Sequence, residues 1–257
     1  MIPVLGIPFF DRDIPAAAEL VLNEITSGAA RGQNRCISAS GAHGLVEAHK
    51  DPAFKALLQS FYLNLPDGMP VVWVGRWKGA KQMKRGYGPD FFKELMIRSA
   101  DLPVKHFFCG GKEGVAGELK QKVADRFGNH RVVGTFCPPF REISDAELAD
   151  LGQTINRSGA DMVWIGLSCP KQEKLAKRLA AFTHTGFLVA VGAAFDFHTG
   201  RVKQAPRWMQ QSGLEWLFRL LMEPQRLYKR YFEIVPGFIW LNVKEFLDFY
   251  RAKKDIL

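Results

Sequence analysis

The chain has 257 residues, 47% of them hydrophobic and 24% charged, a composition that supports one sizeable core and excludes a disordered protein. Its formal net charge is +9, so we expect an anionic partner: a nucleic acid, an anionic membrane or a phosphorylated ligand. The N-terminus lacks a basic and apolar leader pattern and no run of ~18 apolar residues occurs, so we expect a soluble or peripheral protein.

Short apolar runs alternate with longer amphipathic runs along most of the chain. The apolar runs predict strands, in chain order, at residues 4–7, 35–40, 62–65, 105–109, 131–136, 161–167 and 187–195. The amphipathic runs predict helices at residues 16–25, 41–50, 51–61, 113–127 and 170–182, and another that begins at Ser144. Asp13 precedes the first helical run as a capping acid, and Ser144 with Glu147 matches a capping box.

This alternation predicts an α/β fold with a parallel sheet and helices on both faces. Ligands of such sheets bind at the carboxyl ends of the strands. Functional residues are therefore expected just after each strand, at 67–68, 110–111, 168–173 and 195–196.

The four cysteines show no C-x-x-C spacing, and we interpret them as small buried residues of a reducing cytosol. Cys36, Cys109 and Cys137 each lie in an apolar, strand-like context.

The last fifth of the chain differs in composition from the rest, because it has a helical pattern and is rich in aromatic and basic residues. Residues 201–257 contain 11 Lys and Arg against 6 Asp and Glu, a net of +5. We therefore predict two parts: an α/β domain at 1–204 and a helical C-terminal appendage at 205–257.

The first motif with chemical content is the block 65–70, in which Asp67 and Gly68 follow a predicted strand. A carboxylate held at a strand end can act as a general base toward an acceptor hydroxyl. An ordinary Asp-Gly turn would give the same pattern.

Two further motifs suggest contacts with phosphate. Gly110 and Gly111 lie between a strand and a helix, where backbone amides can approach an anion. Gly166 ends the strand before a helix that opens with Pro170, and Lys171 and Gln172 could reach a diphosphate or sugar hydroxyls. A tight turn and a capped helix start are the structural alternatives.

A fourth motif runs through residues 191–207. Gly192 and its small neighbours would let a ligand lie against the backbone, and Asp196 could hold ribose or sugar hydroxyls. Arg201 and Arg207 could meet phosphates, whose geometry suits guanidinium donors.

Taken together and in this order, the motifs resemble the WecG/TagA/CpsF glycosyltransferases of bacterial surface polysaccharide synthesis. The resemblance covers nearly the whole chain. It rests on residues 5–8, 50–54, 66–70, 85–90, 110–111, 170–173, 192–196, 201, 205–206, 213–216, 219, 223–224 and 226.

The resemblance implies a Rossmann-like core and an inverting transfer of a hexose or N-acetylhexosamine-type sugar from a UDP-sugar to a polyprenyl-diphosphate-linked sugar. It implies no cofactor and no metal, and a cytoplasmic enzyme that is peripheral on the inner face of the plasma membrane. Asp67 matches the family's proposed base, and Arg85 matches an arginine that could offset charge on the leaving UDP.

The remaining site residues follow from the motifs and the resemblance together. The predicted donor-binding residues are Ser40, Gly68, Gly110, Gly111, Gly166, Lys171, Gln172, Glu173, Gly192, Phe195 and Asp196. The residues predicted to contact the acceptor or a diphosphate are His43, Arg201, Arg207, Arg219 and Arg226.

One segment departs from the family. Many members have a Thr in a T-x-N segment about 28 residues before the aspartate, whereas this chain reads Ser-Ala-Ser at 38–40. Ser40 would stand for the Thr, and this leaves the donor sugar open. His43 either contacts the sugar or acceptor or makes a structural hydrogen bond.

The C-terminal segment fits a membrane-docking role, because aromatic side chains favour the membrane interface and cations suit anionic headgroups. Its aromatic residues include Trp208, Trp216, Phe218, Tyr228, Tyr231, Phe232 and Trp240. A helical hairpin that closes the core, or a homo-oligomer interface, would explain the same residues.

Two other classes of function stay open. A non-catalytic nucleotide-sugar or lipid-binding subunit of a polysaccharide assembly complex would explain the altered segment at 38–40. A nucleic-acid-binding protein would explain the charge, but no helix-turn-helix, finger or RNP motif occurs, so we expect no nucleic-acid partner.

Overall fold

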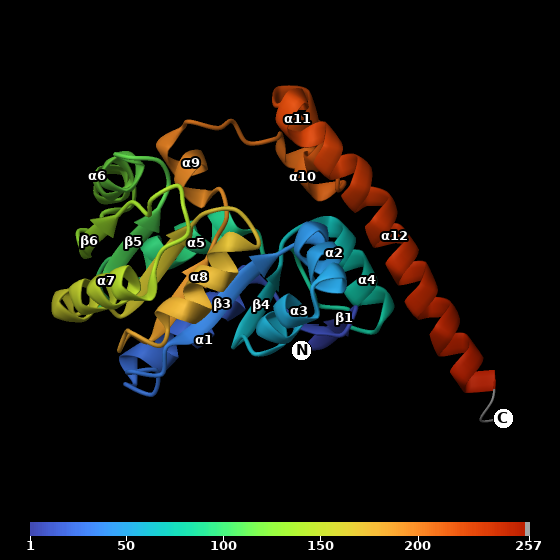
Figure 1. Ribbon diagram of the computed structural model, residues 1–257, viewed down its shortest axis with the longest axis horizontal. Helices are drawn as coiled ribbons and strands as arrows, with labels where there is room; N and C mark the ends of the chain where they lie inside the picture. Colours follow the sequence, from blue (N-terminus) through green and yellow to red (C-terminus); the bar gives the residue numbers. More distant parts are fainter. Residues whose placement is uncertain (255–257) are drawn as a thin grey trace.

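The computed structural model in Figure 1 describes residues 1–254, with side chains up to residue 248, so the predicted appendage is described except for its last three residues. Its centre is a six-stranded parallel sheet with the order β4-β3-β8-β7-β5-β6. The strands are β3 (Arg35–Ser40), β4 (Leu63–Pro66), β5 (His106–Gly110), β6 (Val132–Phe136), β7 (Met162–Gly166) and β8 (Phe187–Ala190).

Helices cover both faces of this sheet, which confirms the predicted α/β, Rossmann-like core (Figure 1). The helices of the core are α1 (Ile14–Thr26), α2 (Ala42–Lys50), α3 (Pro52–Gln59), α4 (Met69–Trp77), α5 (Gly88–Arg98), α6 (Val115–Phe127), α7 (Asp145–Ser158), α8 (Lys171–Leu179) and α9 (Ala194–Thr199). The C-terminal helices are α10 (Arg207–Gln211), α11 (Glu215–Met222) and α12 (Pro224–Lys254).

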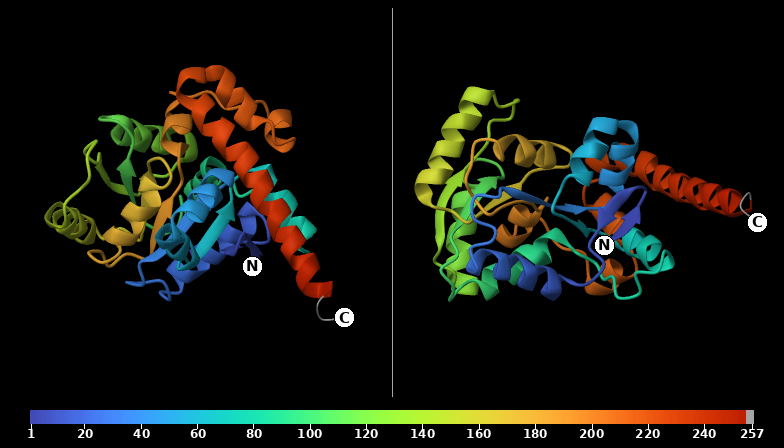
Figure 2. Two further views of the ribbon diagram at one scale, coloured as in Figure 1. Left: turned by 45° about the vertical axis from the view of Figure 1, so that its right-hand side comes forward. Right: turned by 90° about the horizontal axis from the view of Figure 1, so that it is seen from below.

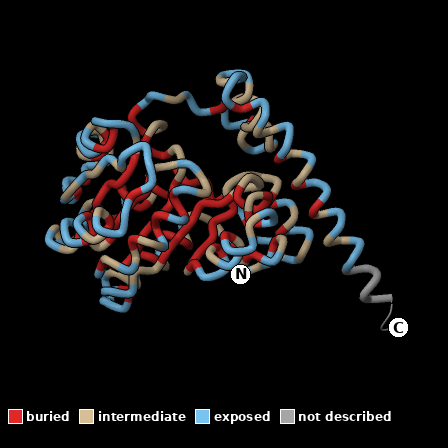
Figure 3. Tube along the Cα trace, in the orientation of Figure 1, coloured by how far each residue is buried: buried red, intermediate tan, exposed pale blue. Residues whose placement is uncertain are grey.

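Successive side chains of the strands point to opposite faces of the sheet and pack into two separate hydrophobic cores. Trp164 of β7 packs on one face with residues of α1, α5, α6 and α9, whereas its neighbours Val163 and Ile165 pack on the other face with α7 and α8. Because both faces are covered, the central strands are buried along their whole length (Figure 3).

A third core joins the N-terminus to the last helix. Strands β1 (Ile2–Val4) and β2 (Ile7–Phe9) form an antiparallel pair that packs with α2 and α4. Ile234, Phe238 and Leu241 of α12 are buried in the same cluster. The division at residue 204 stays a prediction, but the last helix shares its hydrophobic core with the N-terminal part of the chain.

Three local predictions were wrong. Residues 4–7 do not form a strand, because Leu5 and Gly6 adopt positive φ and turn the chain between β1 and β2. The strand predicted at 187–195 ends at Ala190, since Gly192 has a φ of 60° and the chain then begins α9. Cys137 is exposed, because it lies beyond the end of the edge strand β6.

The predicted helix caps are confirmed. The Asp13 carboxylate accepts a hydrogen bond from the amide of Ala16, and Ser144 and Glu147 form a complete capping box. Among the described residues, no helix is long and apolar enough to cross a membrane.

The close approach of β5 and β7 predicts a large effect of a single methyl group. A Cβ on Gly110 would lie 2.5 Å from the carbonyl oxygen of Gly166, and Gly110 has a φ of 147°. We therefore expect Gly110→Ala to lower the free energy of unfolding by roughly 2–3 kcal/mol, measured by urea denaturation. Gly117→Ala is the control, because a Cβ there meets nothing within 4 Å and should stabilise α6 by up to about 1 kcal/mol. A wild-type midpoint for Gly110→Ala would contradict this account.

Candidate active site

The ends of β3 and β4 are pressed together at the carboxyl edge of the sheet. Asp67 directly follows β4, and its amide donates to the carbonyl oxygen of Ser40 at 3.0 Å. A Cβ on Gly41 would lie 2.2 Å from the carbonyl oxygen of Asp67, so only glycine fits there. Gly68 then adopts a φ of 118°, which turns the chain into α4 and leaves the Asp67 side chain at the strand end.

Arg85 reaches Asp67 from the loop between α4 and α5. The amide of Gly86 donates to the carbonyl oxygen of Pro66, which anchors this loop to the end of β4. The Arg85 guanidinium stacks on the ring of Tyr87 at 3.9 Å, and its Nη2 lies 3.7 Å from Oδ1 of Asp67. The structure therefore brings the two predicted catalytic residues together.

The C-terminal helices supply two further partners of Arg85. Its Nη2 donates to Oε2 of Glu215 at the start of α11, and its Nη1 donates to Oε1 of Gln210 of α10 at 3.1 Å. The guanidinium is thus shared between the end of β4 and two helices that lie more than 120 residues later in the chain.

The environment of Asp67 favours the protonated acid. Burial raises the pKa of Asp67 to about 7, against the opposing effect of Arg85, with smaller contributions from Glu215, Arg219 and Asp90. The side chain nevertheless remains 30% exposed, so a reacting group can approach it. A carboxylate with this pKa can take a proton near neutral pH.

Several buried polar atoms around Asp67 lack a partner. Arg85 Nε, Arg219 Nε and the hydroxyl of Tyr87 are inaccessible to solvent and make no hydrogen bond. Most buried polar groups in proteins are paired, so these unpaired atoms make the cluster a candidate functional site.

A second polar cluster lies behind the ends of β3 and β8. Ser38 donates to Oε1 of Glu173 at 2.9 Å, and Ser40 lies 2.8 Å from Ser38. Gln172 donates to the same Glu173 oxygen at 2.8 Å and accepts from the amide of Gly192 at 2.8 Å. Three of the predicted donor-binding residues therefore belong to one network with Ser38 and position the turn at Gly192.

Glu173 is the centre of this network and is completely buried. Its Oε2 has no hydrogen-bond partner, and burial raises its pKa against the opposing hydrogen bonds from Gln172 and Ser38. Both hydrogen bonds end on Oε1, so one oxygen of Glu173 joins Ser38 to Gln172.

The glycines at the strand ends have different surroundings. The Cβ positions of Gly110 and Gly166 are filled by the backbone of β7 and by the ring of Phe195, and the amide of Gly111 donates to Gly166. Close packing within the protein therefore explains these glycines without a ligand, and their role in donor binding stays a prediction. Gly192, in contrast, has open space at its Cβ position.

The other predicted donor residues lie along the same edge. Lys171 is exposed at the start of α8, and Asp196 is half-buried in the first turn of α9. The edge runs from β4 to β5 across four strand spacings, roughly 20 Å, so a donor that touches Asp67 and Gly110 would have to lie across it.

The predicted acceptor residues fall into two groups. His43 of α2 and Arg219 of α11 are half-buried, and burial together with Arg230 of α12 lowers the pKa of His43 to about 4. Arg201, Arg207 and Arg226 are exposed. Arg201 forms an ion pair with Glu118 of α6, and Arg226 forms one with Glu223.

Sequence reasoning missed Glu215, Gln210, Tyr87 and Ser38. Glu215 lies in the block 213–216 that supports the family resemblance, but no chemical role follows from its local sequence. The available signal was an isolated acid at the start of an apolar helix, which a cap or a dipole interaction explains equally well.

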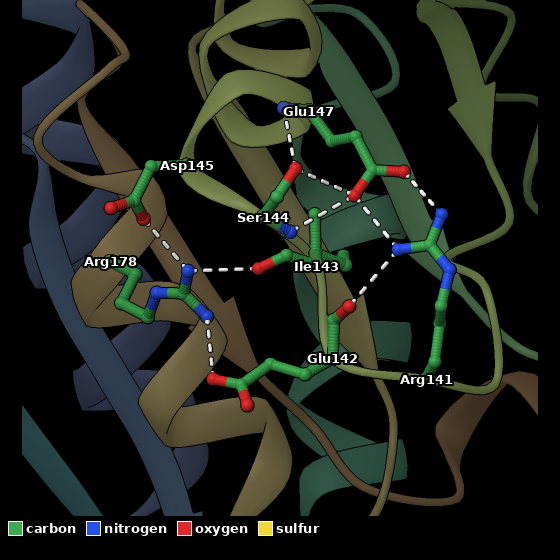
Figure 4. Close-up of polar contacts among 7 residues, drawn as sticks. All are labelled: Arg141, Glu142, Ile143, Ser144, Asp145, Glu147 and Arg178. Atoms are coloured by element: carbon green, nitrogen blue, oxygen red, sulfur yellow. Dashed lines mark hydrogen bonds and ion pairs between the residues drawn. The ribbon is translucent and has the colours of Figure 1, made fainter.

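The loop after β6 carries another missed residue, the fully exposed Phe140. Figure 4 shows how the end of this loop is fixed: Arg141 makes two hydrogen bonds to Glu147, and Arg178 of α8 contacts Glu142, the Ile143 carbonyl and Asp145. Lys171 Nζ lies 5.5 Å from the centre of the Phe140 ring, which places an aromatic face beside a predicted phosphate contact.

Among the described residues, no group of three or more His, Cys, Asp and Glu side chains could hold a metal ion. That the reaction needs no metal stays a prediction.

A parallel α/β sheet with a partly buried carboxylate and an arginine at its carboxyl edge fits an enzyme that binds a ligand at that edge and moves a proton. Residues 2–252 match the family model described as "Glycosyl transferase WecG/TagA/CpsF family". The chain belongs to this glycosyltransferase family.

The buried Glu173 predicts a pH-dependent stability. Because its folded pKa is raised, its contribution to the free energy of unfolding is fully present below the unfolded pKa and is lost as pH rises through the folded pKa. Glu173→Gln keeps an acceptor at the Oε1 position and removes the charge. We therefore expect the stability of this variant relative to the wild type to increase as pH rises above 4.5, the ordinary pKa of a glutamate, measured by urea denaturation.

Glu147→Gln is the matched control with the opposite sign. Hydrogen bonds from Arg141 and Ser144 lower the pKa of Glu147 below its ordinary value of 4.5, so this variant should be less stable than the wild type above pH 4.5, and the difference should shrink as pH falls below that value. Equal pH dependence of Glu173→Gln and the wild type would show that Glu173 does not titrate as described.

Proposed function

We propose that this glycosyltransferase inverts the anomeric centre of a hexose or N-acetylhexosamine-type sugar as it moves the sugar from UDP to a polyprenyl-diphosphate-linked sugar. The product would serve exopolysaccharide, capsule or teichoic-acid-type synthesis. The observation that carries the proposal is the carboxylate of Asp67, whose pKa of about 7 and position beside Arg85 suit a general base.

In the proposed reaction, Asp67 accepts the proton of the acceptor hydroxyl while the oxygen of that hydroxyl attacks the anomeric carbon. The bond from that carbon to the UDP oxygen breaks on the opposite face, which inverts the centre. Negative charge develops on UDP, and cationic side chains near the sheet edge can offset it. Arg85, Lys171 and Arg219 are the candidates, because Arg85 lies beside Asp67, Lys171 is exposed at a helix N-terminus and Arg219 has an unpaired Nε. No cofactor or metal is required for this step.

The donor is proposed to lie along the carboxyl edge of the sheet. The Gln172–Gly192 hydrogen bond fixes a turn with open space above it, and Asp196 follows in α9. Phe140 is proposed to stack on the uracil ring of the UDP-sugar, because a fully exposed aromatic ring beside Lys171 offers a flat face next to a cation.

The acceptor's lipid requires access to a membrane, and α12 supports this part of the proposal. Its buried face carries Leu227, Ile234, Phe238 and Leu241. We call the opposite, exposed apolar side of α11 and α12 the outer face; it carries Leu221, Met222, Tyr228, Phe232, Ile239, Trp240, Val243 and Leu247. Figure 2 shows α12 extending beyond the body of the molecule.

Exposed cations, among them Lys229 and Lys244, accompany the outer face. An apolar surface edged by cations suits an anionic membrane, which supports a peripheral location on the inner face of the plasma membrane. Homo-oligomer formation stays a prediction.

The function is tested by UDP release from a panel of UDP-sugars, with and without a short-chain polyprenyl-diphosphate-sugar. We expect acceptor-dependent release from one donor. Asp67→Asn should reduce kcat by about 10²–10⁴-fold without loss of UDP binding, because it removes the base but keeps the shape. In the wild type, kcat/KM should rise about tenfold per pH unit below pH 7 and level off above it.

Full activity of Asp67→Asn would remove Asp67 as the base. Tight UDP binding without turnover on any acceptor would favour the non-catalytic subunit instead.

The outer face predicts a change in vesicle binding. Phe232 is 84% exposed, so Phe232→Glu should leave the fold intact and weaken binding to vesicles that contain phosphatidylglycerol by about tenfold or more. Ile97→Glu on α5 is the control, because Ile97 is also an exposed apolar residue but lies outside the outer face. Equal losses for both variants in a sedimentation assay would show that docking does not use this face.

A further inference from the structure

The hydrogen-bonded partner of Arg85 is Glu215 rather than Asp67. The Arg85 guanidinium donates directly to the Glu215 carboxylate, whereas Asp67 lies 3.7 Å from the same nitrogen. Gln210 holds the second terminal nitrogen at 3.1 Å, and the ring of Tyr87 covers the guanidinium plane. All of these contacts are largely shielded from water, since the side chains of Arg85 and Glu215 are only 14% and 15% exposed.

The geometry matters because an arginine can disable a carboxylate base. A direct, two-bond pairing of guanidinium and carboxylate stabilises the ionised carboxylate and lowers its proton affinity. Arg85 lies close enough to Asp67 for such a pairing, but its Nη2 group, which would donate to Asp67, donates to Glu215 instead.

We propose that Glu215 is a positioning residue that holds the Arg85 guanidinium out of direct pairing with Asp67, so that the docked α11 keeps Asp67 available as a proton acceptor. The inference rests on the proposed function of Asp67 as a base and deepens it. It assigns to the C-terminal helices a role in setting the strength of that base.

The charges that face Asp67 come from three elements. Arg85 lies on the loop before α5, Asp90 lies on α5, and Glu215 and Arg219 lie on α11. Glu215 and Asp90 raise the pKa of Asp67, and Arg85 and Arg219 lower it. Loss of the Glu215 charge would leave two cations against one acid, so the pKa of Asp67 would fall.

The test is a direct titration of Asp67 by ¹³C NMR of aspartate-labelled protein, with Asp67→Asn used to assign the signal. We expect Glu215→Gln, which keeps the shape and removes the charge, to shift the Asp67 titration downward by about one pH unit. Glu245→Gln is the matched control: it removes another ion pair between the C-terminal helices and the core, at 2.5 Å from Lys78, without contact to Arg85. An unchanged pKa of Asp67 in the folded Glu215→Gln variant would overturn the proposal.

A second variant covers the case in which Glu215→Gln does not fold. Glu215→Asp retains the negative charge but moves it away from Arg85. It should lower the pKa of Asp67 by less than Glu215→Gln does. If only the thermal stability of this variant changes, Glu215 is an anchor of α11 and the proposal fails.

Kinetics separates this inference from the proposed function. If the wild type transfers sugar, Glu215→Gln should move the acidic limb of the plot of kcat/KM against pH to lower pH. The variant should also reach a lower plateau of kcat/KM, because a weaker base accepts the proton less readily. If the wild type transfers no sugar from any donor, the proposed function fails, whereas the NMR titration still decides whether Glu215 controls Asp67.

Discussion

The ion cluster around Arg85 is the constraint on which the candidate site depends. It joins the end of β4, the loop before α5 and the first turn of α11 through one guanidinium. A buried arginine needs counter-charges, and here they come from segments far apart in the sequence. Neither Asp67 nor the C-terminal helices can therefore be understood alone: the helices fix the arginine, and the arginine faces the carboxylate.

Two carboxyl groups near β3 have different surroundings and different proposed roles. Asp67 remains partly open and is placed to react, whereas Glu173 is closed off and organises Ser38, Gln172 and the turn at Gly192. Burial raises the pKa of both groups. The difference in their access to solvent separates a proposed catalytic role from a positioning role.

The last helix serves two environments because its two sides differ. Ile234, Phe238 and Leu241 enter a core with the N-terminal hairpin, while the outer face, including Phe232 and Trp240, stays exposed. The buried side fixes the helix to α2 and α4, and the exposed side remains for a partner. The amphipathic helix therefore connects the proposed membrane contact to the N-terminal core.

The sequence by itself determined the α/β class, most strand positions, the caps at Asp13 and Ser144, and the family, because these depend on local periodicity and on motifs in order. It also placed Asp67 after a strand. Only the tertiary structure decided that Glu215 and Gln210 hold Arg85 and that Ser38 joins Glu173. It also decided that Gly110 is required by the close approach of β7 and Gly166 by the ring of Phe195. These facts depend on contacts between residues 50 to 140 positions apart, which no local pattern encodes.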